Sequence, residues 1–138
     1  MSVDETLVNV ELFRDIDKND LEMLAKIVVE RQFKAGDVIV KEGEPGLAFY
    51  IIARGKAEVV KGEQVLATLG PEDFFGEMAL FDDSPRSASV RAVEDTECLV
   101  MSKWDLKTVF MATDARVAFA LLAVLARRVR NLTDAVTH

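Results

Sequence analysis

Histidine, cysteine and proline are scarce in this sequence. Its 138 residues include one histidine, His138 at the last position, one cysteine, Cys98, and three prolines. A metal site built from histidine and cysteine ligands therefore cannot be assembled, since such a site needs several of them. A lone cysteine also excludes a disulfide within the chain, which agrees with a reducing compartment.

Positive charge and long apolar runs are lacking as well. The chain has 17 Lys and Arg against 24 Asp and Glu, a net charge of −7, whereas binding to a nucleic-acid backbone needs a basic surface. The longest apolar stretch, Val117 to Ala126, is shorter than the roughly 20 residues that span a bilayer, and the N-terminus has no signal-peptide pattern. We therefore expect a cytoplasmic protein that binds neither nucleic acid nor membrane.

The pattern of apolar residues predicts one domain over 1–138, with helices at both ends of a β-rich middle. In the N-terminal helical part, 1–29, Asp17 is a candidate N-cap, and Leu12 and Phe13 precede it as a staple or short turn. From 30 to 102, short runs rich in Val, Ile, Phe and Tyr alternate with glycine turns, which is typical of a barrel, roll or sandwich. The expected strands are 31–34, 38–41, 48–53, 56–61, 64–69, 87–92 and 96–101.

Two helices are expected in the C-terminal part, 103–138. Ser102 and Asp105 form a capping-box-like start for the first, Lys103–Phe110, in which we expect Trp104 to lie in the core. The second runs from Thr113 or Asp114 toward Val136 and carries two apolar stripes. The short stripe is Val117, Leu121 and Val124, and the heptad series is Ala115, Ala118, Leu122, Leu125, Val129, Leu132 and Val136. This pattern has two interpretations. Both stripes could form one wide apolar face that packs against the strands, or the heptad series could pack against the same helix of a second copy in a homodimer.

The segment from Phe75 to Val90 carries the clearest chemical signal. Gly76 allows a sharp turn, and Glu77–Phe81 suit a single helical turn whose N-terminal amides could face an anion. Pro85 fixes the approach to the next strand, at which the Arg86 guanidinium can pair with two phosphate oxygens and the Ser87 hydroxyl lies beside it. A carboxylate next to a phosphate suits a ribose hydroxyl better than the phosphate itself, so Glu77 is interpreted as that acceptor.

These residues resemble the phosphate-binding cassette of the cyclic nucleotide-binding domain family. Residues 75–80 and 85–90 match the family pattern F-G-E-[ILM]-A-L, a short loop, and P-R-x-A-[ST]-V, and residues 12–13, 36–39, 42–44, 49–52 and 55 fall where the family has its other signatures. One departure is Leu47, where the family commonly has Asp. The resemblance implies an α+β fold: an eight-stranded, jelly-roll-like β-roll with an N-terminal helix and with C-terminal helices that form a lid.

The resemblance also implies a role for each site residue. Arg86 would pair with the cyclic phosphate, Glu77 would accept a hydrogen bond from the ribose 2′-OH, and Ser87 would lie at the phosphate or the base. The residues implied at the phosphate and ribose are Gly76, Glu77, Met78, Ala79, Arg86, Ser87 and Ala88. Those implied at the base and in the lid are Val59, Leu66, Leu69, Leu132 and Thr133. Leu132 stands where the bacterial catabolite activator has a hydroxyl residue.

The function that the resemblance implies is that of a non-enzymatic sensor of 3′,5′-cyclic AMP, with cGMP as the alternative ligand and no metal. The sequence shows no nucleophile–base pair and no Gly-rich mononucleotide loop. The ligand would fix the cassette, and the C-terminal helices would rearrange over it and signal to a downstream protein or a second copy. Two alternatives stay open. One is the ligand-sensing fragment of a catabolite-activator-type transcription regulator, which would need a helix-turn-helix beyond His138; the other is a nucleotide-independent interaction or dimerisation module.

Overall fold

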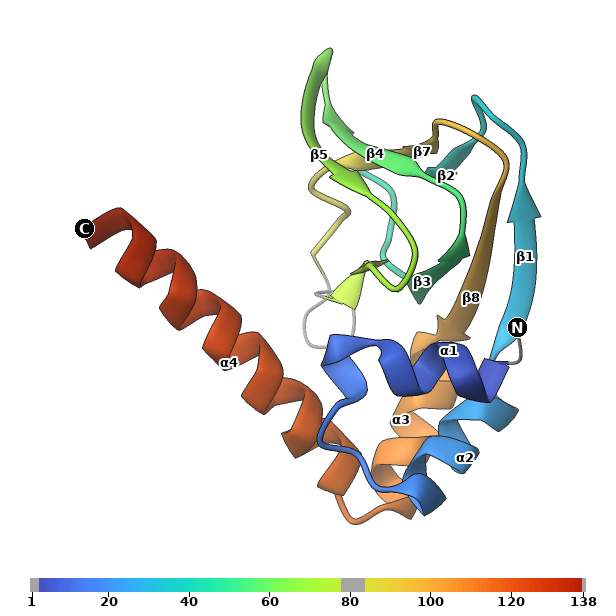
Figure 1. Ribbon diagram of the computed structural model, residues 1–138, viewed down its shortest axis with the longest axis vertical. Coiled ribbons are helices and arrows are strands. Elements are labelled where there is room, and N and C mark those ends of the chain that lie inside the picture. Colours follow the sequence, from blue (N-terminus) through green and yellow to red (C-terminus); the bar gives the residue numbers. More distant parts are fainter. Residues whose placement is uncertain (1–2, 78–83, 138) are drawn as a thin grey trace.

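The computed structural model of the protein describes residues 3–77 and 84–137. Three helical segments come first: α1 (Val3–Asn9), the 3-10 turn η1 (Glu11–Phe13) and α2 (Lys18–Lys26). The eight strands are β1 (Val29–Phe33), β2 (Val38–Val40), β3 (Ala48–Arg54), β4 (Ala57–Lys61), β5 (Gln64–Leu69), β6 (Phe74–Phe75), β7 (Ser89–Ala92) and β8 (Thr96–Ser102). Two helices follow, α3 (Lys103–Ala112) and α4 (Arg116–Thr137). The expected α+β fold with an eight-stranded β-roll is confirmed (Figure 1).

The strands form two four-stranded antiparallel sheets, ordered β1-β8-β3-β6 and β2-β7-β4-β5. Successive side chains of a strand point to opposite faces of its sheet. In β3 and β8 both faces are buried, so their alternate residues fall into two hydrophobic cores. Phe49, Ile51, Leu99 and Met101 belong to the first core, and Tyr50, Ile52, Cys98 and Val100 belong to the second. A single sheet therefore separates a core under the helices from a core inside the roll.

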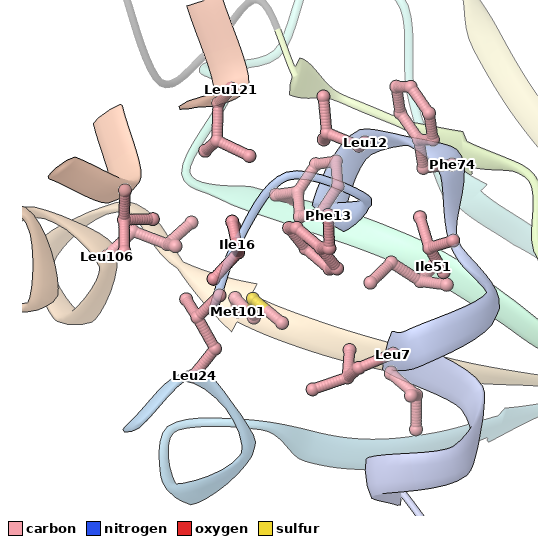
Figure 2. Close-up of a cluster of buried hydrophobic side chains, with 14 of the residues drawn as sticks. Leu7, Leu12, Phe13, Ile16, Leu24, Ile51, Phe74, Met101, Leu106 and Leu121 are labelled. Carbon is pink, nitrogen blue, oxygen red and sulfur yellow. The ribbon is translucent and has the colours of Figure 1, made fainter. Parts of the chain in front are cut away.

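The first core joins the helices to the sheet. Figure 2 shows Phe13, Leu24, Leu106 and Leu121 converging on Met101 and Ile51 of the sheet. Burial of this apolar surface is the main stabilising contribution. The short stripe of α4 provides its share, because Val117, Leu121 and Val124 are each only 1% exposed.

Polar contacts fix how the helices begin and how they meet. The Asp17 carboxylate accepts from the backbone N–H of Asp20, and the Ser102 hydroxyl accepts from that of Asp105, so both expected N-caps are confirmed. The Arg116 guanidinium at the start of α4 donates two hydrogen bonds to the buried Asp20 carboxylate, at 3.1 and 3.2 Å. This pair ties α4 to α2.

The junction between α3 and α4 turns the chain by 115°. Asp114 and Ala115 both have positive φ, 49° and 65°, and the Ala115 N–H donates to the Phe110 carbonyl at 2.8 Å, which is a hydrogen bond typical of helix ends. As a result α4 leads away from the roll (Figure 1). Among the described helices none alone is long and apolar enough to cross a membrane, although α3 and residues 116–127, bent as they are, meet that length and composition together.

Three features differ from the sequence-based expectation. Helix α1 and the two-residue strand β6 were not predicted. The expectation that Trp104 lies in the core is wrong, since it is 60% exposed. At about 3.6 residues per turn, the buried face of α3 that carries Leu106 and Val109 lies on the side opposite Trp104.

The buried thiol of Cys98 should make the protein sensitive to alkali. Burial raises its pKa from the ordinary 9.0 to about 12, so the unfolded chain releases this proton at lower pH than the folded chain. The thiol's contribution to the free energy of unfolding is therefore complete below about pH 9 and declines above it by about 1.4 kcal/mol per pH unit, until the pH approaches the folded-state value. Urea denaturation at about pH 8 and about pH 10 should show wild type losing about 1.4 kcal/mol more than Cys98→Ala. Equal losses would contradict the assignment.

Candidate functional site

A cavity of about 400 Å³ lies inside the roll, between the β-strands and the segment that follows β6. This volume is within the range of about 300–1,000 Å³ that small-molecule sites occupy. Most of the described lining is apolar, and Glu77 and Arg86 are its charged members. The lining residues are Val40, Gly46, Val59, Leu69, Phe74, Phe75, Gly76, Glu77, Ser84, Pro85, Arg86, Ser87, Ala88 and Val90.

The Arg86 side chain is held at the cavity wall by β3. Its Nη2 donates a hydrogen bond of 2.6 Å to the carbonyl oxygen of Ala48. Its guanidinium carbon lies 5.9 Å from the centre of the Tyr50 ring, within the range of a cation–π contact. Ala48 and Tyr50 both belong to β3, so one strand holds Arg86 through a backbone carbonyl and through an aromatic side chain.

Gly76 leaves the room that this arrangement needs. Its φ is +84°, a conformation that side chains with a Cβ rarely adopt. A Cβ built on it would lie 2.5 Å from Arg86 Nη1 and 2.9 Å from the Ala48 carbonyl oxygen. The glycine is therefore required both by the turn and by the close approach of the guanidinium.

The electrostatic setting favours an anion beside Arg86. Burial lowers the pKa of the Arg86 guanidinium from its ordinary value, while Tyr50 and Glu77 act in the opposite direction. An arginine remains protonated under these conditions. The half-buried Arg86 guanidinium has lost part of its hydration. An anionic group that accepts hydrogen bonds from its remaining N–H groups would replace the hydrogen bonds to water that burial removed.

Backbone contacts fix the segment around Arg86 from the other side. The Arg86 N–H donates to the Glu44 carbonyl at 2.8 Å, and the Arg86 carbonyl accepts from the Gly43 N–H at 2.9 Å. Pro45 and Pro85 form an isolated β-bridge. The Leu47 carbonyl accepts from the Lys103 N–H at 2.9 Å. The adjacent carbonyls of Leu47 and Ala48 therefore bind the start of α3 and the Arg86 side chain, respectively.

The structure brings together most of the site residues named from the sequence. Lining the same cavity are Gly76, Glu77, Arg86, Ser87, Ala88, Val59 and Leu69. Met78 and Ala79 lie outside the described residues, as does most of the helical turn expected after Glu77. Leu132 and Thr133 belong to the last turns of α4, and their side chains lie outside those that the structure describes.

Leu66 is the described residue that does not join the cavity. It is 50% exposed and is absent from the lining. The β4–β5 register shifts at this point, where Val59 pairs with Ala67 and Val60 pairs with Val65, so Leu66 falls at the irregularity between them. A bulge of this kind changes which face a side chain takes.

Sequence reasoning missed the residues that hold Arg86. Ala48 and Tyr50 were placed in a strand but given no part in the site. The signal was present in the alternation of β3, since Phe49 and Ile51 take one face and Tyr50 and Ile52 the other. Val40 and Gly46 were missed as lining residues because their place at the cavity depends on how the strands fold together.

Comparisons with known proteins agree with this geometry. The family model described as the cyclic nucleotide-binding domain matches residues 30–113. The CRP-like cAMP-activated global transcriptional regulator of Mycobacterium tuberculosis is 32% identical over 143 residues, covering 97% of this chain and 63% of the regulator. The cAMP-dependent protein kinase regulatory subunit of Dictyostelium discoideum is 39% identical over 108 residues, covering 72% of this chain and 33% of the subunit. The structure of the N-terminal domain of a transcriptional regulator from Streptomyces coelicolor A3(2) has a TM-score of 0.83 and 31% identity, covering 95% of this chain and 94% of that one.

The curated relatives are regulatory proteins by name, and the chain spans 63% and 33% of their lengths. The family model covers more than half of the chain, including the strands and the described part of the segment that forms the cavity. The chain belongs to the cyclic nucleotide-binding domain family.

Proposed function

We propose that this chain is a non-enzymatic sensor that binds 3′,5′-cyclic AMP in the cavity of the roll. The observation that carries the proposal is the Arg86 guanidinium, held by Ala48 and Tyr50 at the wall of an otherwise mostly apolar cavity with Glu77 beside it. The mycobacterial and Dictyostelium relatives, whose names refer to cAMP, match 97% and 72% of this chain, whereas two relatives named as cGMP-dependent protein kinases match 67% and 59%. This greater coverage favours cAMP, with cGMP as the alternative ligand. A cytoplasmic location is part of the proposal, in keeping with the free thiol of Cys98.

The proposed ligand contacts follow from the chemistry of the lining. The cyclic phosphate pairs with the remaining N–H donors of Arg86, and the Ser87 hydroxyl and the backbone of Gly76 and Ala88 lie along the same wall. Met78 and Ala79 complete this part of the proposal. Glu77 accepts a hydrogen bond from the ribose 2′-OH, because a carboxylate facing the phosphate itself would repel it.

The base is proposed to rest on the apolar part of the cavity. Val59 and Leu69, on neighbouring strands, provide that surface. Leu66, Leu132 and Thr133 are proposed to cover the base only after a rearrangement, since no described residue of α4 lines the cavity. A ligand that contacts one arrangement of α4 better than another shifts the equilibrium toward it, and this shift is the signal that we propose the chain passes to a downstream protein or a second copy.

Removal of the Arg86 guanidinium should abolish most of the affinity. In Arg86→Ala the phosphate would enter the cavity without its charge partner, at a cost of about 2–5 kcal/mol, and Arg86→Lys should bind more weakly than wild type because the bidentate fork is lost. Calorimetric titration with cAMP and with cGMP measures both effects and the nucleotide preference. Arg91→Ala is the matched control, since Arg91 is half exposed and pairs with Glu58 outside the cavity. Unchanged affinity in a folded Arg86→Ala protein would reject the site.

The role of Glu77 is testable through the ligand. If its carboxylate accepts from the 2′-OH, then 2′-deoxy-cAMP should bind wild type more weakly than cAMP by about 10-fold or more. In Glu77→Ala the two nucleotides should bind almost equally, because the two changes remove the same contact. If 2′-deoxy-cAMP still bound Glu77→Ala more weakly than cAMP by the wild-type factor, Glu77 would stabilise the backbone of the segment and would not contact the ribose.

The face of α4 that points away from the first core supports a homodimer. Leu122 and Val129 of the heptad series are 42% and 62% exposed, and Phe119 beside them is 70% exposed. Leu125, from the same series, is partly buried and packs on the first core. The two stripes therefore overlap at Leu125, and the surface left for a partner helix is centred on Leu122 and Val129.

A charge on this face should break the proposed dimer. Leu122→Lys would place an ammonium group among apolar side chains at the seam, whereas Ala123→Lys, at an exposed neighbouring position of the helix, serves as the control. Sedimentation should give a dimer for wild type and Ala123→Lys and a monomer for Leu122→Lys. A wild type that is monomeric at micromolar concentration, with and without cAMP, would reject the seam.

A further inference from the structure

Behind the Arg86 guanidinium lies an aromatic stack that the proposed ligand contacts do not use. The rings of Tyr50 and Phe75 are parallel, with an interplanar angle of 4° and centroids 4.9 Å apart. The two residues are register partners in β3 and β6. Tyr50 is only 7% exposed, and Phe75 is 6% exposed. The stack is therefore a fixed part of the second core rather than a surface contact.

The Tyr50 ring limits the movement of the Arg86 guanidinium on one side, and the Ala48 carbonyl and Gly76 limit it on others. Arg86 lies over the Tyr50 ring at 5.9 Å, donates to the Ala48 carbonyl at 2.6 Å, and passes so close to Gly76 that a Cβ there would clash with Nη1. A free arginine side chain loses much rotational freedom when it is ordered by a ligand. A side chain that is already ordered avoids that cost at the moment of binding.

We propose that Tyr50 is a positioning residue for cyclic nucleotide binding, whose ring face holds the Arg86 guanidinium at the cavity wall before the phosphate arrives. The inference rests on the proposed function, because it concerns the same phosphate contact. Tyr50 does not line the cavity, so its effect on the ligand passes through Arg86. The ring contributes through its face, and the hydroxyl is not required for this role.

Substitutions of Tyr50 distinguish the effect of its aromatic ring from the effect of its apolar volume. Tyr50→Phe keeps the ring and should bind cAMP within about twofold of wild type, whereas Tyr50→Leu should weaken binding by roughly 5- to 30-fold. In an Arg86→Lys background the further loss caused by Tyr50→Leu should shrink, since the two residues act through one contact. Phe33→Leu is the matched control: it removes the other arginine–aromatic pair, in which Arg31 lies 5.3 Å from the Phe33 ring, away from the cavity.

A fluorinated ring provides a variant that keeps the shape of the core. Tyr50 is the only tyrosine in the chain, so biosynthetic incorporation of 3,5-difluorotyrosine alters this residue alone. Fluorine withdraws electron density from the ring face and weakens its attraction for a cation. At a pH where the fluorinated phenol keeps its proton, cAMP affinity should fall by about 2- to 5-fold. The 19F signal of the unliganded protein should differ from that of the labelled Arg86→Ala protein.

The outcomes separate this inference from the function on which it rests. If wild type binds neither cAMP nor cGMP, the proposed function fails, and the 19F comparison still shows whether the ring holds the guanidinium. If wild type binds cAMP and both the Tyr50→Leu and the fluorinated proteins bind equally well, the positioning role is rejected while the function stands. An identical 19F chemical shift in the labelled wild-type and Arg86→Ala proteins would also reject the positioning role of Tyr50. Equal weakening by Phe33→Leu would show that loss of core packing, rather than loss of the Arg86 contact, lowers the affinity.

Discussion

The hydrogen bond from Arg86 to the Ala48 carbonyl is the contact on which the rest of the site depends. It binds the segment after β6 to the central sheet, and it places a cation inside a protein whose net charge is −7. The overall charge of a chain governs long-range attraction, but recognition of one phosphate depends on the few groups that touch it. Here Arg86 is placed by two features: strand β3, which offers the Ala48 carbonyl and the Tyr50 ring, and Gly76, whose missing Cβ leaves room for the guanidinium.

The parts of the structure that were predictable are those in which the sequence signal is local. Asp17 and Ser102 were recognised as N-caps because each is a short polar residue just ahead of a helical pattern, and the structure confirms both. The strands were recognised from runs of β-branched and aromatic residues between glycines. The elements of the site from Gly76 to Arg86 were recognised because the order of several residues in one segment is far more specific than any one of them. The roles of the individual residues toward a ligand stay predictions.

The parts that were not predictable depend on packing between distant segments. A two-residue strand such as Phe74–Phe75 is too short to show any periodicity, and it is defined only by its pairing with β3. The exposure of Trp104 follows from which face of α3 meets the helices, a choice that the hydrophobicity of one side chain does not reveal. Leu66 lies at a register shift, and such a shift cannot be seen in either strand alone. Which apolar residues of α4 are buried likewise depends on how α4 packs against η1 and the first core.

The sheet shared by the two cores has a thermodynamic consequence. Because Phe49 and Tyr50 are neighbours on opposite faces of β3, the helical core cannot come apart without removing the wall of the cavity. We therefore expect both cores to unfold as one cooperative unit, so that a molecule bound in the cavity also stabilises α1 and α2, which do not line it. For a single site the gain is RT ln(1 + [L]/Kd), about 2.7 kcal/mol at a ligand concentration 100-fold above Kd. Binding of a ligand in the roll should therefore raise the melting temperature of the whole domain.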